Sequence, residues 1–330
     1  MYPNSSRSRR LCSLAAGVAG LSLLFAACGG GQTGSADSYP NKSIEMIVPW
    51  SAGGDTDAIF RMIGDGLKEE LGADVVIKNV PGGGGSVGAQ QAMAANNDGY
   101  TLLAGHDSIA ISHISGETDF GYFDFEPISL MTSSYDYVAT AADSSWDDMD
   151  DMIKDAKANP GEISYGASIG STSQLEPALI QAVADVEFNI VGQKDTAERM
   201  QAVVGGHVDL GGVSVVAAKE YLDADKMKLL GYMAPERDDA LPDVPTLKEQ
   251  GIDAASATNR GLFAPEGTPE EIVDKVDDAL AEVAEDQEFV DTLTDLGTDV
   301  NYKNTDEYET WLKDNQEEMQ DAMEKAGMVD

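Results

Sequence analysis

From residue 44 onward, short apolar segments alternate with segments whose apolar residues recur at helical spacing. Ile44–Val48 is mostly apolar, as expected for a buried strand, and the apolar residues of 58–67 then repeat every three or four positions. Further strands are predicted over 75–77 and 101–104, with a helix over 87–95 between them. Strands separated by helices predict parallel β-α-β units in an open α/β sheet.

The same alternation starts again after an acidic loop near residue 145. Helices are predicted over 149–157, Thr172–Ala184, Thr196–Val204 and 214–221, and strands over 163–167, 187–191, 207–210 and Met227–Tyr232. A strand over 262–264 then precedes three acidic helices, over 269–285, up to Gly297 and over 307–326. About 300 residues follow Cys28, which is enough for two α/β domains.

The N-terminus predicts export. Three arginines precede an apolar run over 11–27, and Phe25-Ala26-Ala27 leads directly to Cys28. The small residues before the cysteine favour a lipoprotein signal peptide over 1–27, with Cys28 lipidated, rather than an uncleaved anchor. Residues 28–38 then read as a flexible tether. Arg9-Arg10 leaves open whether export uses the general or the twin-arginine pathway.

Cysteine and charge narrow the function classes. The only other cysteine in the sequence, Cys12, lies in the predicted signal peptide, so the mature domain is expected to have no disulfide and no cysteine nucleophile. After the predicted signal peptide, the chain has 59 acidic and 18 basic residues, which gives a net charge of −41. Nucleic acid binding requires a basic face and is excluded. An excess this large suggests an acidic surface adapted to a salt-rich habitat.

Two α/β halves suit a bilobed receptor whose ligand lies in the cleft at the carboxyl ends of the strands. Helix N-termini at that edge can hold an anion with backbone N–H groups alone. Trp50-Ser51-Ala52-Gly53-Gly54-Asp55-Thr56-Asp57 links the first strand to the first helix. Its glycines allow a tight turn and close approach of a ligand, and Thr56 or Asp57 can cap the helix. This loop is therefore a candidate anion cradle.

Two other loops match enzyme motifs. Gly83 to Gly88 fits the dinucleotide pattern G-x-G-x-x-G, but it follows the second strand rather than the first, so a close-packing turn is favoured. Gly166-Ala167-Ser168-Ile169-Gly170 fits the hydrolase elbow, yet His207 is the only histidine after Ser168. The hydroxyl-rich segment 168–173 makes better sense as a second helix N-terminus that binds an anion.

The three histidines show no metal-ligand spacing. His106 ends the third strand and is a candidate cleft contact, whereas His113 and His207 are interpreted as structural or surface residues. No metal and no cofactor are expected.

Ordered landmarks then match a known family. They are Tyr39-Pro40, Ile47-Val48-Pro49-Trp50, Gly53-Gly54-Asp55-Thr56-Asp57 with Arg61, Asn79-Val80-Pro81-Gly82-Gly83-Gly84-Gly85, Asp98-Gly99-Tyr100-Thr101, Tyr165-Gly166-Ala167-Ser168, Gly205-Gly206-His207-Val208-Asp209, Leu241-Pro242-Asp243-Val244-Pro245 and Gly261-Leu262-Phe263-Ala264-Pro265. From Tyr39 to the C-terminus the chain resembles the extracytoplasmic receptors of tripartite tricarboxylate transporters, the Bug-type solute-binding proteins.

The resemblance implies a two-lobed, type II periplasmic-binding-protein fold, no enzymatic activity and capture of a small organic anion, such as a di- or tricarboxylate. Lobe 1 would comprise 39–141 and 255–330, and lobe 2 would comprise 142–254, with two crossover strands as the hinge. The implied ligand-binding residues are Trp50, Ser51, Ala52, Gly53, Gly54, Thr56, Asp57, His106, Ser108, Ser168, Gly170, Ser171, Thr172, Ser173 and Asp209. The implied partners are the integral-membrane transporter subunits. The receptor would be a monomer, lipid-anchored to the outer face of the cytoplasmic membrane.

Two departures from the family pattern bear on the ligand. Ser51-Ala52 stands where many members carry two prolines, and Gly211-Gly212-Val213 follows Asp209. Citrate, a dicarboxylate or an aromatic carboxylate would all use the same cradle. Possible cationic contacts, which the sequence cannot rank, are Arg61, Lys194, Arg199 and Arg260.

Overall fold

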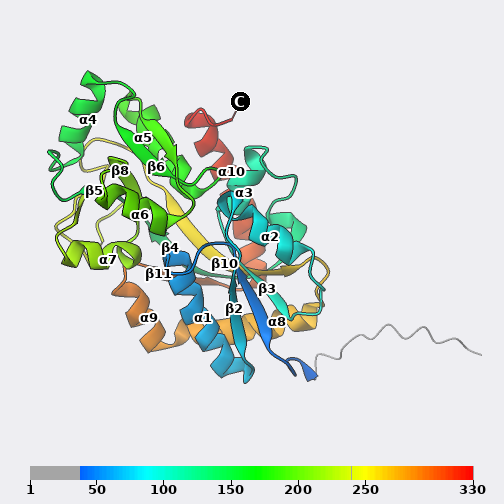
Figure 1. The fold of residues 1–330 in the computed structure, drawn as a ribbon. Coiled ribbons are helices and arrows are strands. Elements are labelled where there is room, and N and C mark those ends of the chain that lie inside the picture. The colour runs from blue at the N-terminus through cyan, green and yellow to red at the C-terminus, as the bar shows by residue number, and fades with distance from the viewer. Residues whose placement is uncertain (1–37, 239, 330) are drawn as a thin grey trace, which may run out of the picture. The chain divides into compact units, whose positions relative to one another are not determined.

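The computed structural model describes residues 38–238 and 240–329. The predicted signal peptide, the lipidated Cys28 and nearly all of the tether lie outside the described residues. The described chain forms two α/β lobes, each built on its own sheet, as the sequence predicts (Figure 1). In the described part of the chain, every helix is too short or too polar to cross a membrane.

The first sheet has six strands in the order β11-β4-β10-β3-β1-β2. Their bounds are β1 Ile44–Val48, β2 Val75–Asn79, β3 Thr101–His106, β4 Phe125–Tyr135, β10 Ala257–Pro265 and β11 Asp299–Lys303. The first three strands are parallel, while β10 is antiparallel to both β3 and β4. Because β1, β2 and β3 point the same way, the loops that follow β1 and β3 meet at one edge of the sheet.

The second sheet has five strands in the order β7-β6-β8-β5-β9. Their bounds are β5 Tyr137–Ala141, β6 Ser164–Ala167, β7 Asn189–Gly192, β8 Leu210–Val213 and β9 Met227–Tyr232. Strands β6, β7 and β8 are parallel, and β5 runs antiparallel to β8 and β9. The chain crosses between the lobes from β4 to β5 and returns before β10. That these crossovers act as the hinge, as the resemblance implies, stays a prediction.

Helices cover both sheets. Their bounds are α1 Asp55–Leu71, α2 Ser86–Met93, α3 Ser108–Ile114, α4 Met149–Ala158, α5 Thr172–Ala184, α6 Thr196–Val204, α7 Val215–Asp223, α8 Glu270–Glu285, α9 Gln287–Thr294 and α10 Thr305–Lys325. In α8 the apolar stripe that includes Val276 and Leu280 is buried, and the acidic residues that include Asp274 and Asp278 face solvent. The acidity read from the sequence is therefore largely a surface property of such helices.

Several elements differ from the sequence prediction. Strand β8 begins at Leu210, where the predicted strand 207–210 ends, because the chain turns back after α6 through Gly205 and Gly206. Helix α3 and strands β4, β5 and β11 are not among the elements predicted from the sequence. Strand β5 belongs to the second sheet, so the sheets divide at Asp136 rather than at the predicted lobe boundary between 141 and 142.

The last helix packs against both lobes. Tyr308 and Leu312, near its start, join the core beneath the first sheet. Met319 and Met323, two turns later, join the core that contains Tyr165 and Leu210 of the second sheet. Helix α10 therefore completes lobe 1, as predicted, and also buries its C-terminal half against lobe 2.

Candidate functional site

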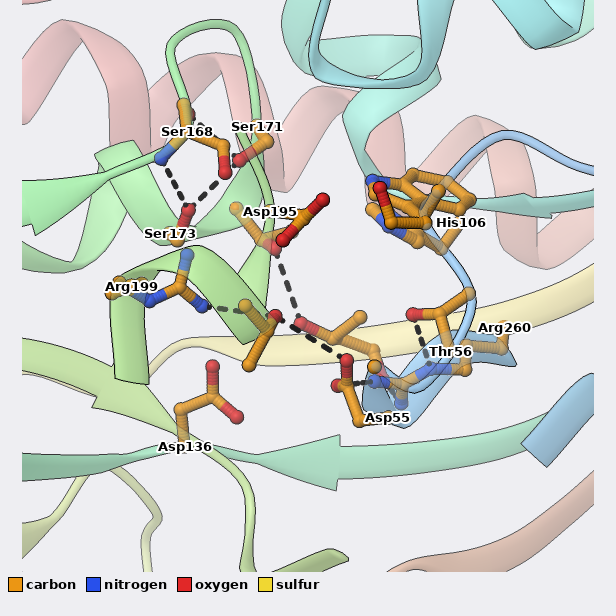
Figure 2. Close-up of a pocket in the computed structure, with 16 residues that line it drawn as sticks. Asp55, Thr56, His106, Asp136, Ser168, Ser171, Ser173, Asp195, Arg199 and Arg260 are labelled. Carbon is orange, nitrogen blue, oxygen red and sulfur yellow. Dashed lines mark hydrogen bonds and ion pairs between the residues drawn. The ribbon is translucent and has the colours of Figure 1, made fainter. Parts of the chain in front are cut away.

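A pocket lies where the two lobes meet, at the carboxyl ends of β1, β3 and β6 and beside the loop after β7 (Figure 2). Its walls include the first residues of three helices, α1, α5 and α6. Helix N-termini carry unsatisfied N–H groups and a partial positive charge, so three of them around one pocket favour an anionic group. The described cavity is small, about 30 Å³.

The loop from Trp50 to Asp57 is held by its own side chains. Asp57 Oδ2 accepts from the Gly53 N–H at 2.9 Å and from Arg61 Nε at 3.0 Å, and Asp57 Oδ1 accepts from Asn79 Nδ2 at 2.8 Å. Burial would raise the pKa of Asp57, but these donors outweigh it and lower the pKa. The predicted side-chain cap is wrong: the N-cap is Gly54, and Asp57 organises the loop instead. The Gly53 N–H therefore already donates to the Asp57 carboxylate.

Of the two glycines in the predicted cradle, only one has a backbone conformation that favours glycine. Gly53 has φ +89°, a conformation that L side chains rarely adopt. Gly54 has φ −85°, and a Cβ atom there would meet only the Ser51 carbonyl, at 3.8 Å. Gly54 nevertheless lines the pocket, as does Ser51, whose buried Oγ has no hydrogen-bond partner among the described residues.

A buried ion pair forms one wall of the pocket. Arg260 Nη2 lies 2.6 Å from Asp55 Oδ2, and the Arg260 side chain is 1% exposed. The same guanidinium donates to Ser134 Oγ at 2.7 Å and to Thr56 Oγ1 at 3.3 Å. Burial alone would raise the pKa of Asp55, but the adjacent Arg260 guanidinium holds it below the usual value. Most of the hydrogen-bonding capacity of Arg260 is therefore used inside the protein.

His106 presents a neutral ring to the pocket. Its Nδ1 accepts from the Ser108 N–H at 3.1 Å, and its ring stacks on Trp50 with centroids 3.7 Å apart. Burial lowers the pKa of His106 well below its usual value, and nearby Arg260 lowers it further. With Nδ1 as acceptor in the neutral ring, Nε2 carries the proton and is the available donor.

The second lobe contributes a hydroxyl-rich turn before α5. The Ser168 N–H donates to Ser173 Oγ at 3.0 Å, and Ser171 Oγ donates to the Ser168 carbonyl at 2.8 Å. Thr172 Oγ1 accepts from Thr258 Oγ1 on β10 at 3.2 Å. These contacts place the hydroxyl groups predicted from the segment 168–173 in one wall of the pocket.

Arg199, on α6, is the cation with the most donor capacity to spare in this pocket. Its Nε donates to the Gly212 carbonyl at 2.7 Å and its Nη2 donates to Thr196 Oγ1 at 3.2 Å. Among the described residues, no carboxylate oxygen lies within 4.0 Å of its guanidinium. A Cβ atom at Gly211 would lie 2.9 Å from the Arg199 side chain, and one at Gly212 would overlap the Glu176 carboxyl. The departure Gly211-Gly212 therefore makes room for two buried ionisable side chains.

Most of the predicted binding residues gather at this pocket, and some do not. Those that line it are Trp50, Ser51, Gly54, Thr56, His106, Ser168, Ser171, Thr172 and Ser173. Those that the structure places outside its lining are Ala52, Gly53, Asp57, Ser108, Gly170 and Asp209. Asp209 lies just before β8, at the opposite edge of the second sheet, and accepts from the Ser164 N–H at 2.8 Å.

Of the four possible cationic contacts, two line the pocket and two do not. Arg61 is half-exposed and paired with Asp57, and Lys194 is exposed, so neither lines the pocket. Arg199 and Arg260 both line it. The lining also includes residues that the sequence analysis did not single out as ligand contacts, namely Asp55, Asp136, Asp195, Thr196 and Thr258. Asp195 and Thr196 begin a helix after a strand, which was a usable signal.

The glycine-rich segment that fits a dinucleotide pattern packs closely instead of opening a binding loop. A Cβ atom at Gly84 would lie 2.8 Å from the carbonyl oxygens of both Ile169 and Gly170 in the other lobe. One at Gly85 would lie 2.8 Å from the Trp50 ring, and one at Gly88 would lie 2.8 Å from Pro49. The prediction of a close-packing turn is confirmed. Within the described residues, no group of three potential ligands could hold a metal ion.

Two open α/β lobes around a polar pocket define a solute-binding protein of the periplasmic type, and two solved structures are similar over nearly their whole length. MatC from Rhodopseudomonas palustris with bound malate is 27% identical, with a TM-score of 0.80, and the match covers 86% of this chain and 99% of that one. An R. palustris protein with adipate is 25% identical, with a TM-score of 0.82, over 88% and 98% of the two chains.

The sequence comparisons identify the family. The model of the tripartite tricarboxylate transporter family receptor matches residues 59–328, so the chain belongs to this family. A relative in Cupriavidus necator, named "UPF0065 protein in gbd 5'region", is 30% identical over 299 residues, 89% of this chain and 90% of that protein. The family consists of substrate-binding receptors, which is not a class of enzymes.

Proposed function

We propose that this protein captures a small organic carboxylate in the pocket between its lobes and delivers it to the membrane subunits of a tripartite tricarboxylate-type transporter. The observation that carries the proposal is the Arg199 guanidinium, which is buried in the pocket wall and forms no ion pair within 4.0 Å among the described residues, although its charge acts on the buried carboxyls of Asp55 and Asp136. A buried cation of this kind is stabilised by an anionic ligand. Malate and adipate, present in the two similar structures, are both dicarboxylic acids.

The proposed contacts come from both lobes. Arg199 and the first N–H groups of α5 and α6 lie on lobe 2, while His106 Nε2–H and Ser51 Oγ lie on lobe 1. In this role Ser168 contributes polar groups to the wall and takes no covalent step. His207, which an esterase triad would need, is exposed and lies outside the pocket lining.

The lobes and the anchor complete the proposal. Lobe 1 comprises 39–136 with 255–330, and lobe 2 comprises 137–254, so that each contains one sheet. The receptor is a monomer that is exported and lipidated at Cys28, with 28–38 as its tether to the outer face of the cytoplasmic membrane. Cys28→Ser should then release the protein from the membrane fraction; unchanged fractionation would contradict the anchor.

The ligand proposal is tested by a thermal-shift screen of the purified protein against organic acids, followed by calorimetry with the acid that binds best. Arg199→Gln should weaken binding by about 1.5–3 kcal/mol, the usual value of a hydrogen bond to a charged group. Lys194→Gln is the matched control, since it removes a cation from the same lobe outside the pocket. Equal affinities of the two variants would overturn the role of Arg199, and failure of every acid to bind would overturn the proposed function.

A further inference from the structure

A second cavity lies on the other face of the strands that join the two lobes. We call it the back pocket; it is bounded by β4, β10, β11, α5 and α10, and its volume is about 580 Å³. Helix α10 contacts both α5 and β4, so residues of both lobes enclose the cavity (Figure 1). Binding sites for small molecules commonly have volumes of about 300–1,000 Å³ and often lie between domains. The back pocket therefore has the size and the position of a small-molecule site.

The back pocket is separate from the pocket described above, because the joining strands present alternate side chains to the two cavities. In β10, Thr258 and Arg260 line the pocket between the lobes, whereas Ala257 and Asn259 line the back pocket. Successive side chains of a strand point to opposite faces, so the strand itself forms the partition. Among the described residues, none lines both cavities. A ligand in the back pocket would therefore be additional to the captured acid.

The amide groups of the back pocket use their donating nitrogens inside the protein. Asn315 Nδ2 donates to Asp107 Oδ1 at 2.9 Å, and Asn259 Nδ2 donates to Asp107 Oδ2 at 3.1 Å. Asn301 Nδ2 donates to Ser133 Oγ at 2.9 Å. Because the oxygen of a side-chain amide only accepts, further hydrogen bonds from these amides fall mainly to acceptor atoms. The back pocket is therefore better suited to a ligand that donates hydrogen bonds.

The charges and the apolar groups of the lining define the ligand further. Among the described residues, the only charged ones that line the back pocket are Asp299 and Glu318, both exposed. Leu175 on α5 and Met319 on α10 supply apolar surface, and Trp311 supplies an aromatic ring. Carboxylates and aromatic faces both attract cations, whereas an organic acid would meet only like charge.

We propose that the back pocket binds a small organic ammonium ion that carries an apolar group. The ammonium group lies toward β11, where it donates to the Asp299 carboxylate and to Asn301 Oδ1. The apolar group lies between α5 and α10, against Leu175 and Met319. This site goes beyond the proposed function, since its ligand has the opposite charge to the captured acid and occupies a different cavity.

The first test compares compounds that share an apolar group and differ in charge. Phenethylamine, 2-phenylethanol and 3-phenylpropionate are positive, neutral and negative, and methylamine keeps the charge without the apolar group. Calorimetry with the wild-type protein should give phenethylamine an affinity on the order of tenfold or more above each of the other three. Asp299→Asn should reduce its preference over the alcohol. Glu317→Gln, which removes an exposed carboxylate of α10 outside the lining, should keep that preference.

Tryptophan fluorescence tests where the amine binds. Trp311 lines the back pocket, whereas Trp146 lies outside the lining and donates to Asp155 Oδ2 at 2.9 Å. Phenethylamine should change the emission of the wild type and of Trp146→Phe, and the change should be lost in Trp311→Phe.

Three results would overturn the proposal. The first is wild-type protein that binds phenethylamine no better than 2-phenylethanol, a comparison that needs no variant and so decides even if a variant fails to fold. The second is a full preference for the amine in folded Asp299→Asn. The third is an emission change that persists in Trp311→Phe, since the amine would then bind elsewhere.

Discussion

At the scale of single residues, the Asp55–Arg260 pair couples the pocket wall to stability. Both side chains are buried, and Arg260 comes from β10 while Asp55 begins α1. Arg260→Leu leaves the Asp55 charge buried without its partner and should lower the free energy of unfolding by about 3–5 kcal/mol. Urea denaturation measures the loss. Adding Asp55→Asn to Arg260→Leu should recover part of the lost free energy of unfolding. If Arg260→Leu alone is as stable as the wild type, the ion pair contributes nothing to stability.

His106 predicts a pH dependence with a definite sign. Burial lowers the pKa of His106 in the folded protein. Below about pH 6.5 the His106 ring is therefore protonated in the unfolded chain but stays neutral in the folded protein. The stability contributed by neutral His106 is therefore complete above pH 6.5 and declines as the pH falls. The melting temperature of wild type minus that of His106→Gln should decrease between pH 7.5 and pH 5. A constant difference over this range would contradict the assignment.

At the scale of elements, the loop before α2 and the loop before α5 meet across the two lobes. Gly84 contacts the carbonyl groups of Ile169 and Gly170, and Ser112 Oγ on α3 donates to the Gly170 carbonyl at 2.9 Å. Gly170, which was predicted as a ligand contact, takes part in this contact between the lobes and is not in the pocket lining. The seam lies beside the pocket, so it stabilises the arrangement in which both walls face the ligand.

A substitution at Gly84 tests that seam. Gly84→Ala would strain the backbone at φ +60° and push the two loops apart, so we expect weaker binding of the best acid found in the screen. Gly72→Ala is the control, because Gly72 has φ +64° but no atom within 4 Å of an added Cβ. Calorimetry should show a loss only for Gly84→Ala. Equal affinities of the two variants would mean that the contact between the loops does not support binding.

At the scale of the whole molecule, charge repulsion opposes folding. The chain has 59 acidic and 21 basic residues, and helices such as α8 expose their acidic side chains to solvent. Salt screens repulsion between exposed charges over about 10 Å at 0.1 M and about 3 Å at 1 M. The melting temperature should therefore rise from dilute buffer to molar sodium chloride. A flat or falling curve would contradict the interpretation of a salt-adapted surface.

The sequence by itself determined the alternation of strands and helices in both halves of the chain and the class of protein, but not α3, β4, β5 or β11. Apolar spacing placed β1, α5, α6 and β9 at or within a residue or two of their observed bounds, because buried faces repeat with the period of each element. Glycines and hydroxyl residues after strands identified the loops around Trp50 and Ser168, since turns and helix N-termini need those residue types. The family landmarks gave the two-lobed fold.

Only the tertiary structure decided which charged residues share the pocket. Arg260 and Asp55 are 205 positions apart, and Asp136 lies between two strands of different sheets, so no local spacing relates them. The sequence could not separate Arg199 and Arg260 from Arg61 and Lys194, because whether a cation is buried depends on packing. Asp209 is the opposite case. It belongs to a family landmark and was predicted as a ligand contact, yet it lies just before β8, at the edge of the second sheet away from the pocket.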